Sequence, residues 1–571
     1  MVEATLPAVV PPFVPVVVAA LLLPFVGRRV GHALGILATA AVVPYVLLVP
    51  EGAHLPTLLF GFDAVLFNVD AFSRLMGLIF GFIGAVAVLY SWASEAEAAQ
   101  TAFALGYVGT SLGAVFGGDW LTLVFFWELM AVTSTLLVWH YGGRAVRAAF
   151  RYALLHGVGG TLLLGAVVWH YAEVGSVLFA DATGMAGVVA PVLAAIGIGV
   201  NVGFVGLHAW LPDTYPRPHV AASVFLCVFT TKTGVYGMYR VFPEGQLAIA
   251  YMGGLMALFG AGMALLQNDM RRLLSYHIQS QVGYMVAGVG IGTALATAGA
   301  FGHVFNHILY KSLLFMTVGV VIYRTGEESL KKVGGLGRKM PLTAVTFTVA
   351  ALSIAGFPGF NGFVSKTMVI SAAHKEHIDV LWYLLLAGGV GTFLSFIKLG
   401  YYAFYHGEYD GEVRDANLGQ SVAMVTVAGL CVVYGVAPGA LYAIVPGSFK
   451  FTAFTTGHLI EGVALAATGV VGFVLLKSPL SLVGRVPDID SLYNPLTFYA
   501  TRAVVFVTTE TFAATDRLVV RASRGVVAAV SDPGRAVGDL VGTDRVDLEA
   551  DIGTSVLLVT AALALALVLV L

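Results

Sequence analysis

Apolar runs of about 20 residues recur along nearly the whole chain, and short polar segments separate them. Each run is long enough to cross a lipid bilayer as a helix, which needs about 20 apolar residues. The pattern predicts membrane spans near 7–26, 31–50, 71–92, 99–118, 119–140, 152–172, 188–208, 219–241, 246–267, 273–293, 296–323, 341–371, 380–403, 418–439, 458–476 and 552–571. The expected fold is all-α, a polytopic membrane bundle of about 14–16 spans.

Composition agrees with a membrane protein. Of the 571 residues, 58% are hydrophobic and 11% charged, whereas a soluble domain carries about 25% charged residues. This excludes a soluble enzyme and a disordered chain. The net charge of −2 and the lack of a basic tract argue against a nucleic-acid partner. Cys227 and Cys431 lie in apolar runs and are interpreted as small buried hydrophobes.

The N-terminal run has no positive segment and no small-residue cleavage site, so we expect a first span rather than a removable signal. Basic residues gather in the loops that follow odd-numbered spans: Arg28, Arg29, Arg144, Arg147, Arg151, Arg271, Arg272, Arg324, Lys331, Lys332, Arg338, Lys339, Lys477 and Arg485. Because basic loops stay in the cytoplasm, this pattern predicts a multi-pass protein of the cell membrane with both termini outside.

Two spans look interrupted. The seventh contains GIGIGVNVGFVG, with Gly203, and runs into LPDTYPRPH, with Pro212; the twelfth contains AGFPGFNGFVSK around Pro358. Interruptions at corresponding positions of two halves point to an inverted-repeat transporter. The alternative is glycine used for close helix packing.

Residues 478–551 form the longest polar stretch and mix apolar with charged positions at helical spacing. An amphipathic helix on the cytoplasmic membrane face is the expected structure. A solvated linker to the last span is the alternative.

Few ionisable residues fall inside the spans. A charge near the bilayer centre costs at least about 2.5 kcal/mol, so such residues are rare and often functional. The set is Glu128, Lys232, His303, His307, Lys311, Lys366 and Lys398. Glu128 lies mid-span and must be neutral or paired. Burial disfavours the ammonium form of Lys232, which suits it to bind and release protons; a structural ion pair is the alternative.

His303, His307 and Lys311 follow one another at four-residue spacing, which places them on one helix face. Such a column can hold water and pass protons, since imidazole titrates near neutrality. A metal site or a static polar network are the alternatives, but the helix offers no acidic or thiol neighbour, so we predict neither metal nor cofactor. With Lys366 after the proline interruption and Lys398 mid-span, the set predicts a lateral proton wire.

Six strings occur in the order typical of one known family: GDWLTLVFFWELM, GLHAWLPDTYPRPHVAASVFLCVFTTKTGVYGMYR, QNDMRRLLSYHIQSQVGYM, GHVFNHILYKSLLF, VGGLGRKMPLT and AGFPGFNGFVSK. The chain resembles the antiporter-like subunits shared by Mrp-type sodium/proton antiporters and the L, M and N subunits of respiratory complex I. FTTKTGVY and SYHIQSQVGYM look most like the D-type subunit of the Mrp assembly.

The resemblance implies two inverted five-helix repeats with broken seventh and twelfth helices. The implied parts are N-terminal spans (1–98), a first repeat (99–241), a second repeat (246–403), two further spans (418–476), the cytoplasmic segment (478–551) and a last span (552–571). It also implies that Glu128 is the fifth-helix glutamate, Lys232 the eighth-helix base and Lys366 the terminal twelfth-helix group, with His303, His307 and Lys311 as the connecting column.

One position departs from the family pattern. Relatives carry a lysine seven residues before the histidine of LHxWLP, where it pairs with the glutamate; here that position is Asn201. Asparagine carries no charge, so Lys232 is the expected substitute partner of Glu128. Alternatively, Glu128 is protonated, ion transfer differs, or the chain serves as a scaffold.

Together these features predict a proton-translocating subunit, not an enzyme, of a multi-subunit cation/proton antiporter with sodium as the cation. Its partners are other subunits of a hetero-oligomeric membrane complex, protons, sodium and the bilayer. The alternatives are a proton-pumping subunit of complex I or a membrane hydrogenase, and a non-translocating accessory subunit.

Overall fold

The computed structural model describes residues 9–180, 183–484, 486–544 and 552–570. The chain divides into two compact units, Met1–Val486 and Pro487–Leu571. Residues 7–8 of the predicted first span, 545–551 of the predicted amphipathic segment and the last residue, 571, lie outside the described residues.

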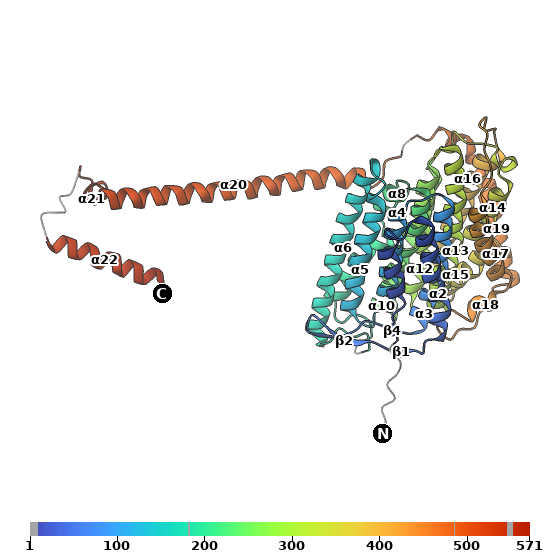
Figure 1. Ribbon diagram of the computed structural model, residues 1–571, viewed down its shortest axis with the longest axis horizontal. Helices are drawn as coiled ribbons and strands as arrows, with labels where there is room; N and C mark the ends of the chain where they lie inside the picture. Colours follow the sequence, from blue (N-terminus) through green and yellow to red (C-terminus); the bar gives the residue numbers. More distant parts are fainter. Residues whose placement is uncertain (1–8, 181–182, 485, 545–551, 571) are drawn as a thin grey trace, which may run out of the picture. The chain divides into compact units, whose positions relative to one another are not determined.

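Helices build the first unit, and they stand side by side and roughly parallel to one another (Figure 1). Their bounds are α1 Phe13–Leu22, α2 Arg28–Leu48, α3 Ala71–Ala93, α4 Ala98–Phe116, α5 Trp120–Trp139, α6 Arg144–Val174, α7 Val189–Val202, α8 Trp210–Thr214, α9 Val220–Leu226, α10 Phe229–Val241, α11 Leu247–Leu265, α12 Met270–Ile291, α13 Ala294–Thr325, η1 Leu336–Arg338, α14 Pro341–Ala355, α15 Asn361–Lys375, α16 Asp379–Gly400, η2 Tyr401–Tyr405, α17 Leu418–Val436, α18 Pro438–Tyr442 and α19 Thr456–Leu482.

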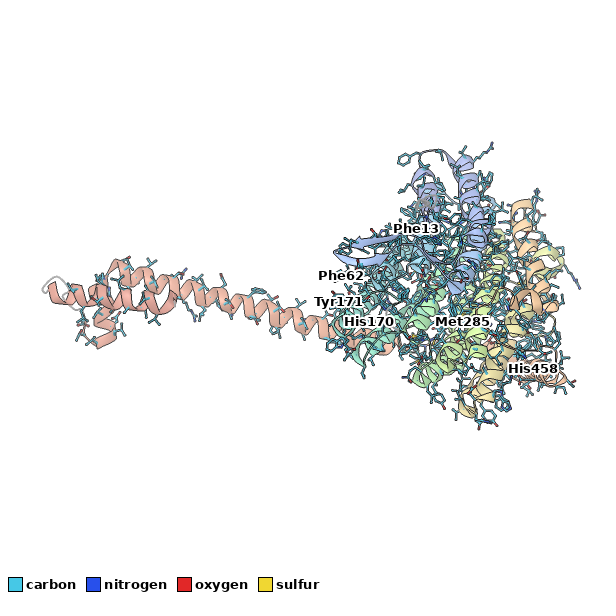
Figure 2. All side chains as sticks on the ribbon, turned by 90° about the horizontal axis from the view of Figure 1, so that it is seen from below. Phe13, Phe62, His170, Tyr171, Met285 and His458 are labelled. Atoms are coloured by element: carbon cyan, nitrogen blue, oxygen red, sulfur yellow. The ribbon has the colours of Figure 1, made fainter. Side chains whose placement is uncertain are left out.

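The helical membrane bundle predicted from the apolar runs is confirmed. Every predicted span contains at least one helix. Among the described residues, ten helices are long and apolar enough to cross a membrane. The structure adds four short strands between the second and third spans, β1 Gly52–Ala53, β2 Pro56–Leu59, β3 Phe62–Val65 and β4 Asn68–Val69, which pair as β1 with β4 and β2 with β3. Figure 2 shows Phe62 of β3 beside Tyr171 of α6, and their rings meet edge to face at 5.0 Å.

Aspartates fix the starts of three of the helices. The side chains of Asp70, Asp119 and Asp269 accept hydrogen bonds from the backbone N–H of the residue three positions on, at the N-termini of α3, α5 and α12. A carboxylate there satisfies an N–H that has no partner inside the helix and complements the positive helix end.

The seventh span is interrupted after α7. Gly203 has a φ of 77°, a left-handed conformation that glycine adopts without strain. The interruption leaves backbone carbonyls without their helical partners, and two side chains bind them: Trp210 Nε1 donates to the carbonyl of Val200 at 2.8 Å, and Gln279 Nε2 donates to that of Gly203 at 3.0 Å. Pro212 lies in the short helix α8 that follows.

Helix α13 forms the centre of the bundle. It packs against α3, α9, α12, α14, α15 and α17, and its membrane-spanning window is fully buried. A helix surrounded on all sides by protein can carry polar side chains that lipid would not tolerate.

The second unit contains α20 Asp490–Ser531, α21 Pro533–Val541 and α22 Ile552–Val570. Helix α20 has 42 residues, which corresponds to about 63 Å at about 1.5 Å per residue. Its described side chains are all exposed or half-exposed within the chain, including Val504, Phe506 and Phe512.

Candidate functional site

Lys366 lies where the twelfth span is interrupted. Helix α14 ends at Ala355, Gly356 adopts a left-handed φ of 83°, and Pro358 lies in the turn before α15. The Lys366 ammonium donates to the carbonyl of Ile354 at 2.8 Å. A lysine bonded to the last carbonyls of a helix also complements its negative end.

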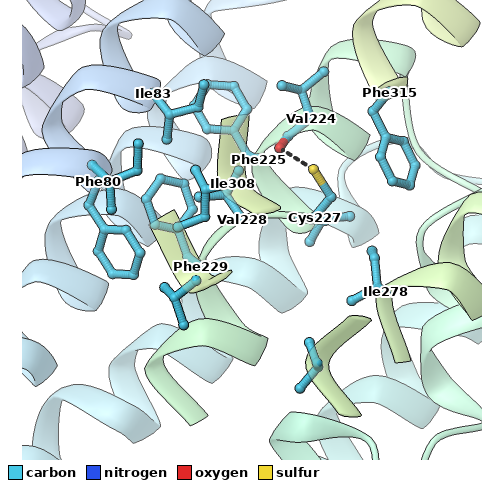
Figure 3. Close-up of a cluster of buried hydrophobic side chains, with 14 of the residues drawn as sticks. Phe80, Ile83, Val224, Phe225, Cys227, Val228, Phe229, Ile278, Ile308 and Phe315 are labelled. Atoms are coloured by element: carbon cyan, nitrogen blue, oxygen red, sulfur yellow. Dashed lines mark hydrogen bonds between the residues drawn. The ribbon is translucent and has the colours of Figure 1, made fainter. Parts of the chain in front are cut away.

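Lys232 has the same arrangement at an interruption between α9 and α10. Its Nζ donates to the carbonyl of Cys227 at 2.5 Å and to Thr231 Oγ1 at 2.9 Å. The backbone N–H of Thr230 donates to the hydroxyl of Tyr107 on α4 at 2.8 Å instead of continuing the helix. Figure 3 shows Cys227 packed among apolar side chains, with its thiol donating to the carbonyl of Val224 at 3.2 Å. The lysine is therefore buried, and its bonds go to backbone and hydroxyl oxygens.

His303 joins α13 to α15 through direct hydrogen bonds. Its Nδ1 lies 2.9 Å from Ser365 Oγ, next to Lys366 along the chain, and its Nε2 lies 3.2 Å from the hydroxyl of Tyr310. Asn306 Nδ2 also donates to Ser365 Oγ, at 3.1 Å. Hydroxyl and imidazole groups thus connect the middle of α13 with Ser365, the residue before Lys366 on α15.

Lys311 and His277 have no hydrogen-bond partners for their side-chain nitrogens among the described residues, although both are fully buried. The Lys311 Nζ lies 5.8 Å from the ring centre of Phe315 and 6.0 Å from that of Phe396. The His277 ring lies 4.7 Å from the same Phe396 ring. Aromatic faces stabilise the Lys311 cation only in part.

His307 lies at the centre of the set. It is within electrostatic range of Lys232, Lys311, His303 and Lys366, and in the described part of the chain both of its buried ring nitrogens lack a hydrogen-bond partner. We call the following residues the buried polar line: Asn201, Lys232, Thr233, His277, Gln279, His303, His307, Lys311 and Lys366.

Many atoms of the buried polar line have no partner within the described ranges, among them both amide atoms of Asn201, Thr233 Oγ1 and Gln279 Oε1. A buried polar group left unsatisfied costs about 1–3 kcal/mol, and water normally fills that role where a site is polar. The arrangement is suited to a hydrated row of proton donors and acceptors across the middle of the bundle.

Glu128 and Lys232 do not form an ion pair in the structure, contrary to the partnership expected from Asn201. Among the described residues no carboxylate lies within ion-pair distance of Lys232. Glu128 is half-buried, its Oε1 has no hydrogen-bond partner in the same ranges, and its carboxyl lies directly against Gly160 of α6. The order of residues along the chain did not show that oxygens at the interruption between α9 and α10 would accept the hydrogen bonds of the Lys232 ammonium.

Lys398 binds the end of α11. Its Nζ donates to the carbonyls of Leu265 and Gln267, both at 2.8 Å, at the end of α11. Its charged neighbour is Lys331, which is in the segment between α13 and α14. These contacts hold the Lys398 ammonium at the end of α11, and the place of Lys398 in the predicted wire stays a prediction.

Several polar residues of the site are missing from the sequence-based set: His277, Gln279, Gln281, Tyr284, Ser365 and Thr392. All are buried, and Gln281 Nε2 donates to Thr392 Oγ1 at 3.3 Å. The string SYHIQSQVGY on α12 carries four of them, so its polarity inside an apolar span was the available signal. Within the described ranges no three His, Cys, Asp or Glu side chains gather as metal ligands.

Comparisons with known proteins agree with this architecture. A family model described as "NADH:quinone oxidoreductase/Mrp antiporter, TM" matches residues 117–395. The D-type subunit of the Na(+)/H(+) antiporter of Alkalihalophilus pseudofirmus is 31% identical over 370 residues, which are 61% of this chain and 75% of the relative.

Two solved structures share the fold. A chain of the membrane-bound sulfane sulfur reductase, an archaeal respiratory membrane complex, superposes with a TM-score of 0.71 at 25% identity, covering 98% of this chain and 99% of that one. A chain of the Mrp complex from Dietzia sp. DQ12-45-1b superposes with a TM-score of 0.67 at 22% identity, covering 81% and 98%. At that lower identity the likeness shows the fold alone.

A multi-pass helical bundle with ionisable side chains buried at its centre defines an ion-transport membrane subunit. The chain belongs to the family of antiporter-like membrane subunits found in Mrp antiporters and NADH:quinone oxidoreductases.

Proposed function

We propose that this chain carries protons along the buried polar line, as one subunit of a hetero-oligomeric complex that exchanges sodium for protons. The observation that carries the proposal is the position of His307, within electrostatic range of Lys232, Lys311, His303 and Lys366. A proton taken up by Lys232 passes by way of Lys311 and His307 to His303 and leaves from Lys366. The chain performs no bond-making chemistry and needs no cofactor for this transfer.

The lysine positions suit reversible proton binding. Burial in a low-dielectric interior disfavours an ammonium ion, whereas the carbonyls of Cys227 and Ile354 at helix ends favour it. These opposing effects act on both Lys232 and Lys366. Glu128, packed on Gly160 at the edge of the bundle, is the proposed entry group.

The proposed orientation follows the charge pattern. Loops rich in arginine and lysine face the cytoplasm, which puts both termini outside and the complex in the cell membrane. The two inverted five-helix repeats remain part of this proposal, and the interruptions after α7 and α14 support them.

The test uses everted membrane vesicles from a host without its own antiporters, carrying the complete complex. We expect added sodium to collapse a preformed pH gradient for the wild type, and Lys232→Ala to abolish the response while the complex stays intact on a native gel. An unchanged response in Lys232→Ala would mean that another subunit holds the working channel and that this chain is a scaffold.

A second function is favoured by one observation. The chain of the respiratory membrane complex covers 98% of this chain, against 81% for the Mrp complex, so its likeness extends into the second unit. Under this alternative the same proton path is driven by a redox reaction in partner subunits. A wild-type complex that moves protons without any response to sodium would support it.

A further inference from the structure

A polar pocket opens between the end of α15 and the start of α19. It has a volume of about 580 Å³. We call it the α15–α19 pocket and define it by its ionisable lining residues His374, Lys375, Lys450, His458 and Glu461. Figure 2 shows His458 at the edge of the bundle, away from Met285 of α12. In the proposed orientation this end of the helices faces the outer side of the membrane.

The floor of the pocket lies one helical turn from Lys366. Ile370 lines the pocket and follows Lys366 by four residues, so the two share one face of α15 about 6 Å apart along its axis. The hydroxyl oxygen of Ser371, the next lining residue, lies 3.1 Å from His458 Nε2. The pocket is therefore lined by the turn of α15 that follows the turn carrying Lys366, the last lysine of the buried polar line.

Tyr284 lies between Lys366 and Glu461. The Lys366 Nζ is 4.7 Å from the centre of the Tyr284 ring, and Tyr284 is in turn within electrostatic range of Glu461. The Tyr284 hydroxyl donates to the carbonyl of Leu385 at 2.6 Å, which fixes the ring. Leu465 lies one turn after Glu461 on α19. Its side chain and the Tyr284 hydroxyl both lie close to Gly389 of α16.

The charges around Glu461 disfavour a bound metal cation. His374 and His458 lie within electrostatic range of its carboxyl, while Lys375 and Lys450 add two positive charges to the lining. From α16 the lining residue is the uncharged Trp382, and from α12 the facing titratable group is Tyr284. Two ammonium groups raise the local positive potential, which repels Na⁺.

Hydrogen bonds fix the position of the His458 ring. Its Nδ1 lies 3.2 Å from the carbonyl of Thr452 and 3.1 Å from that of Ala453. Because carbonyls only accept, Nδ1 carries a hydrogen, and Nε2 lies within hydrogen-bond distance of the Ser371 hydroxyl. His458 thus positions the pocket wall, and Glu461 is left as the carboxylate that can take a proton.

We propose that the α15–α19 pocket is the mouth through which Lys366 exchanges protons with the outer solution, with Glu461 as its proton-binding group. The inference rests on the proposed proton path. In the transfer, the Lys366 ammonium becomes a neutral amine and the Glu461 carboxylate becomes a carboxylic acid. Glu461 then releases the proton to water in the pocket, and Tyr284 separates the two groups between transfers.

The test compares Glu461→Gln with Glu376→Gln in the complete complex, reconstituted in vesicles whose inner and outer pH are set independently. Glu376 is an exposed carboxylate at the end of the same α15 and is a matched control. We expect Glu461→Gln to lower proton transport about tenfold or more, as loss of a positioned proton-transfer group does, and to remove its dependence on outer pH. Glu376→Gln keeps the wild-type rate and pH profile.

Lys366→Ala, measured in parallel, separates two failures. If Lys366→Ala abolishes transport and Glu461→Gln keeps the wild-type rate and pH profile, the pocket is not the mouth, although the proton path stands. If Lys366→Ala leaves transport unchanged, the proton path itself fails.

Access to the pocket is tested independently with Glu461→Cys in whole cells. The native cysteines, Cys227 and Cys431, are buried, so they contribute little background. We expect a membrane-impermeant maleimide added outside to label Glu461→Cys. Labelling only after the maleimide is given access to the cytoplasmic face would contradict a pocket that opens to the outer solution.

Discussion

The buried lysines differ in what holds their ammonium groups. Lys232 and Lys366 bind backbone carbonyls at helix interruptions, and Lys398 binds two carbonyls at the end of α11. Within the described part of the chain, Lys311 has only aromatic faces nearby and no hydrogen-bond partner. A buried cation without hydrogen-bond partners costs free energy. Of these four lysines, Lys311 is therefore the one whose charge the surrounding protein stabilises least.

At the residue scale, Gly160 is expected to set the position of Glu128. A Cβ added at Gly160 would overlap the Glu128 carboxyl, whereas one added at Gly157, on the same helix, would meet no described atom within 4 Å. We expect Gly160→Ala to lower transport about tenfold or more, since displacing a reacting group by about 1 Å costs up to about a hundredfold in rate. Gly157→Ala is the control. Equal rates for the two variants in the vesicle assay would remove Glu128 from the path.

At the scale of elements, three interruptions place the site, and the sequence indicated two of them. Gly203 and Pro358 marked the seventh and twelfth spans because glycine and proline break helices locally. Nothing comparable marks Cys227 and Val228. There the cause is tertiary, since the Thr230 N–H bonds the Tyr107 hydroxyl of another helix. Neighbouring residues along the chain give no sign of such a contact.

We predict that Gly356, in the interruption after α14, leaves the space that the Lys366 side chain needs. Gly356 and Gly359 both have left-handed φ values, 83° and 93°, but of the two only a Cβ at Gly356 would contact Lys366, at 3.1 Å from its Cδ. Alanine at either position costs about 1–2 kcal/mol of backbone strain. We therefore expect similar losses of thermal stability from Gly356→Ala and Gly359→Ala, but a loss of transport only from Gly356→Ala. Loss of transport in both would show that strain alone is responsible.

At the scale of the whole molecule, hydropathy predicted the helical membrane bundle and the order of its helices, because each crossing needs its own apolar run. They did not show which polar side chains meet. The polar face of α12 and the contacts of Lys398 at the end of α11 both depend on how helices pack. The strands at 52–69 escaped notice because they are only two to four residues long.

The second unit leads to a prediction about assembly. Helix α20 exposes apolar side chains such as Val505, Phe506 and Phe512, and exposed apolar surface of this kind marks contact with a membrane or a partner. We expect a chain ending at Val486 to retain the thermal transition of the first unit but to recover fewer partner subunits on co-purification. Undiminished recovery of partners would contradict a role of α20 in assembly.

The most direct measurement compares Lys311→Met with Lys398→Met in the complete complex, recording both the rate of pH-gradient collapse and the thermal stability. Lys311 makes no hydrogen bond to any described residue that its loss would break, so we predict lost transport with unchanged or higher stability. Lys398→Met leaves two carbonyls without their donor, at about 1.5–3 kcal/mol each, so it should lower stability and keep transport. Wild-type transport by Lys311→Met in an intact complex would contradict a proton path along the buried polar line.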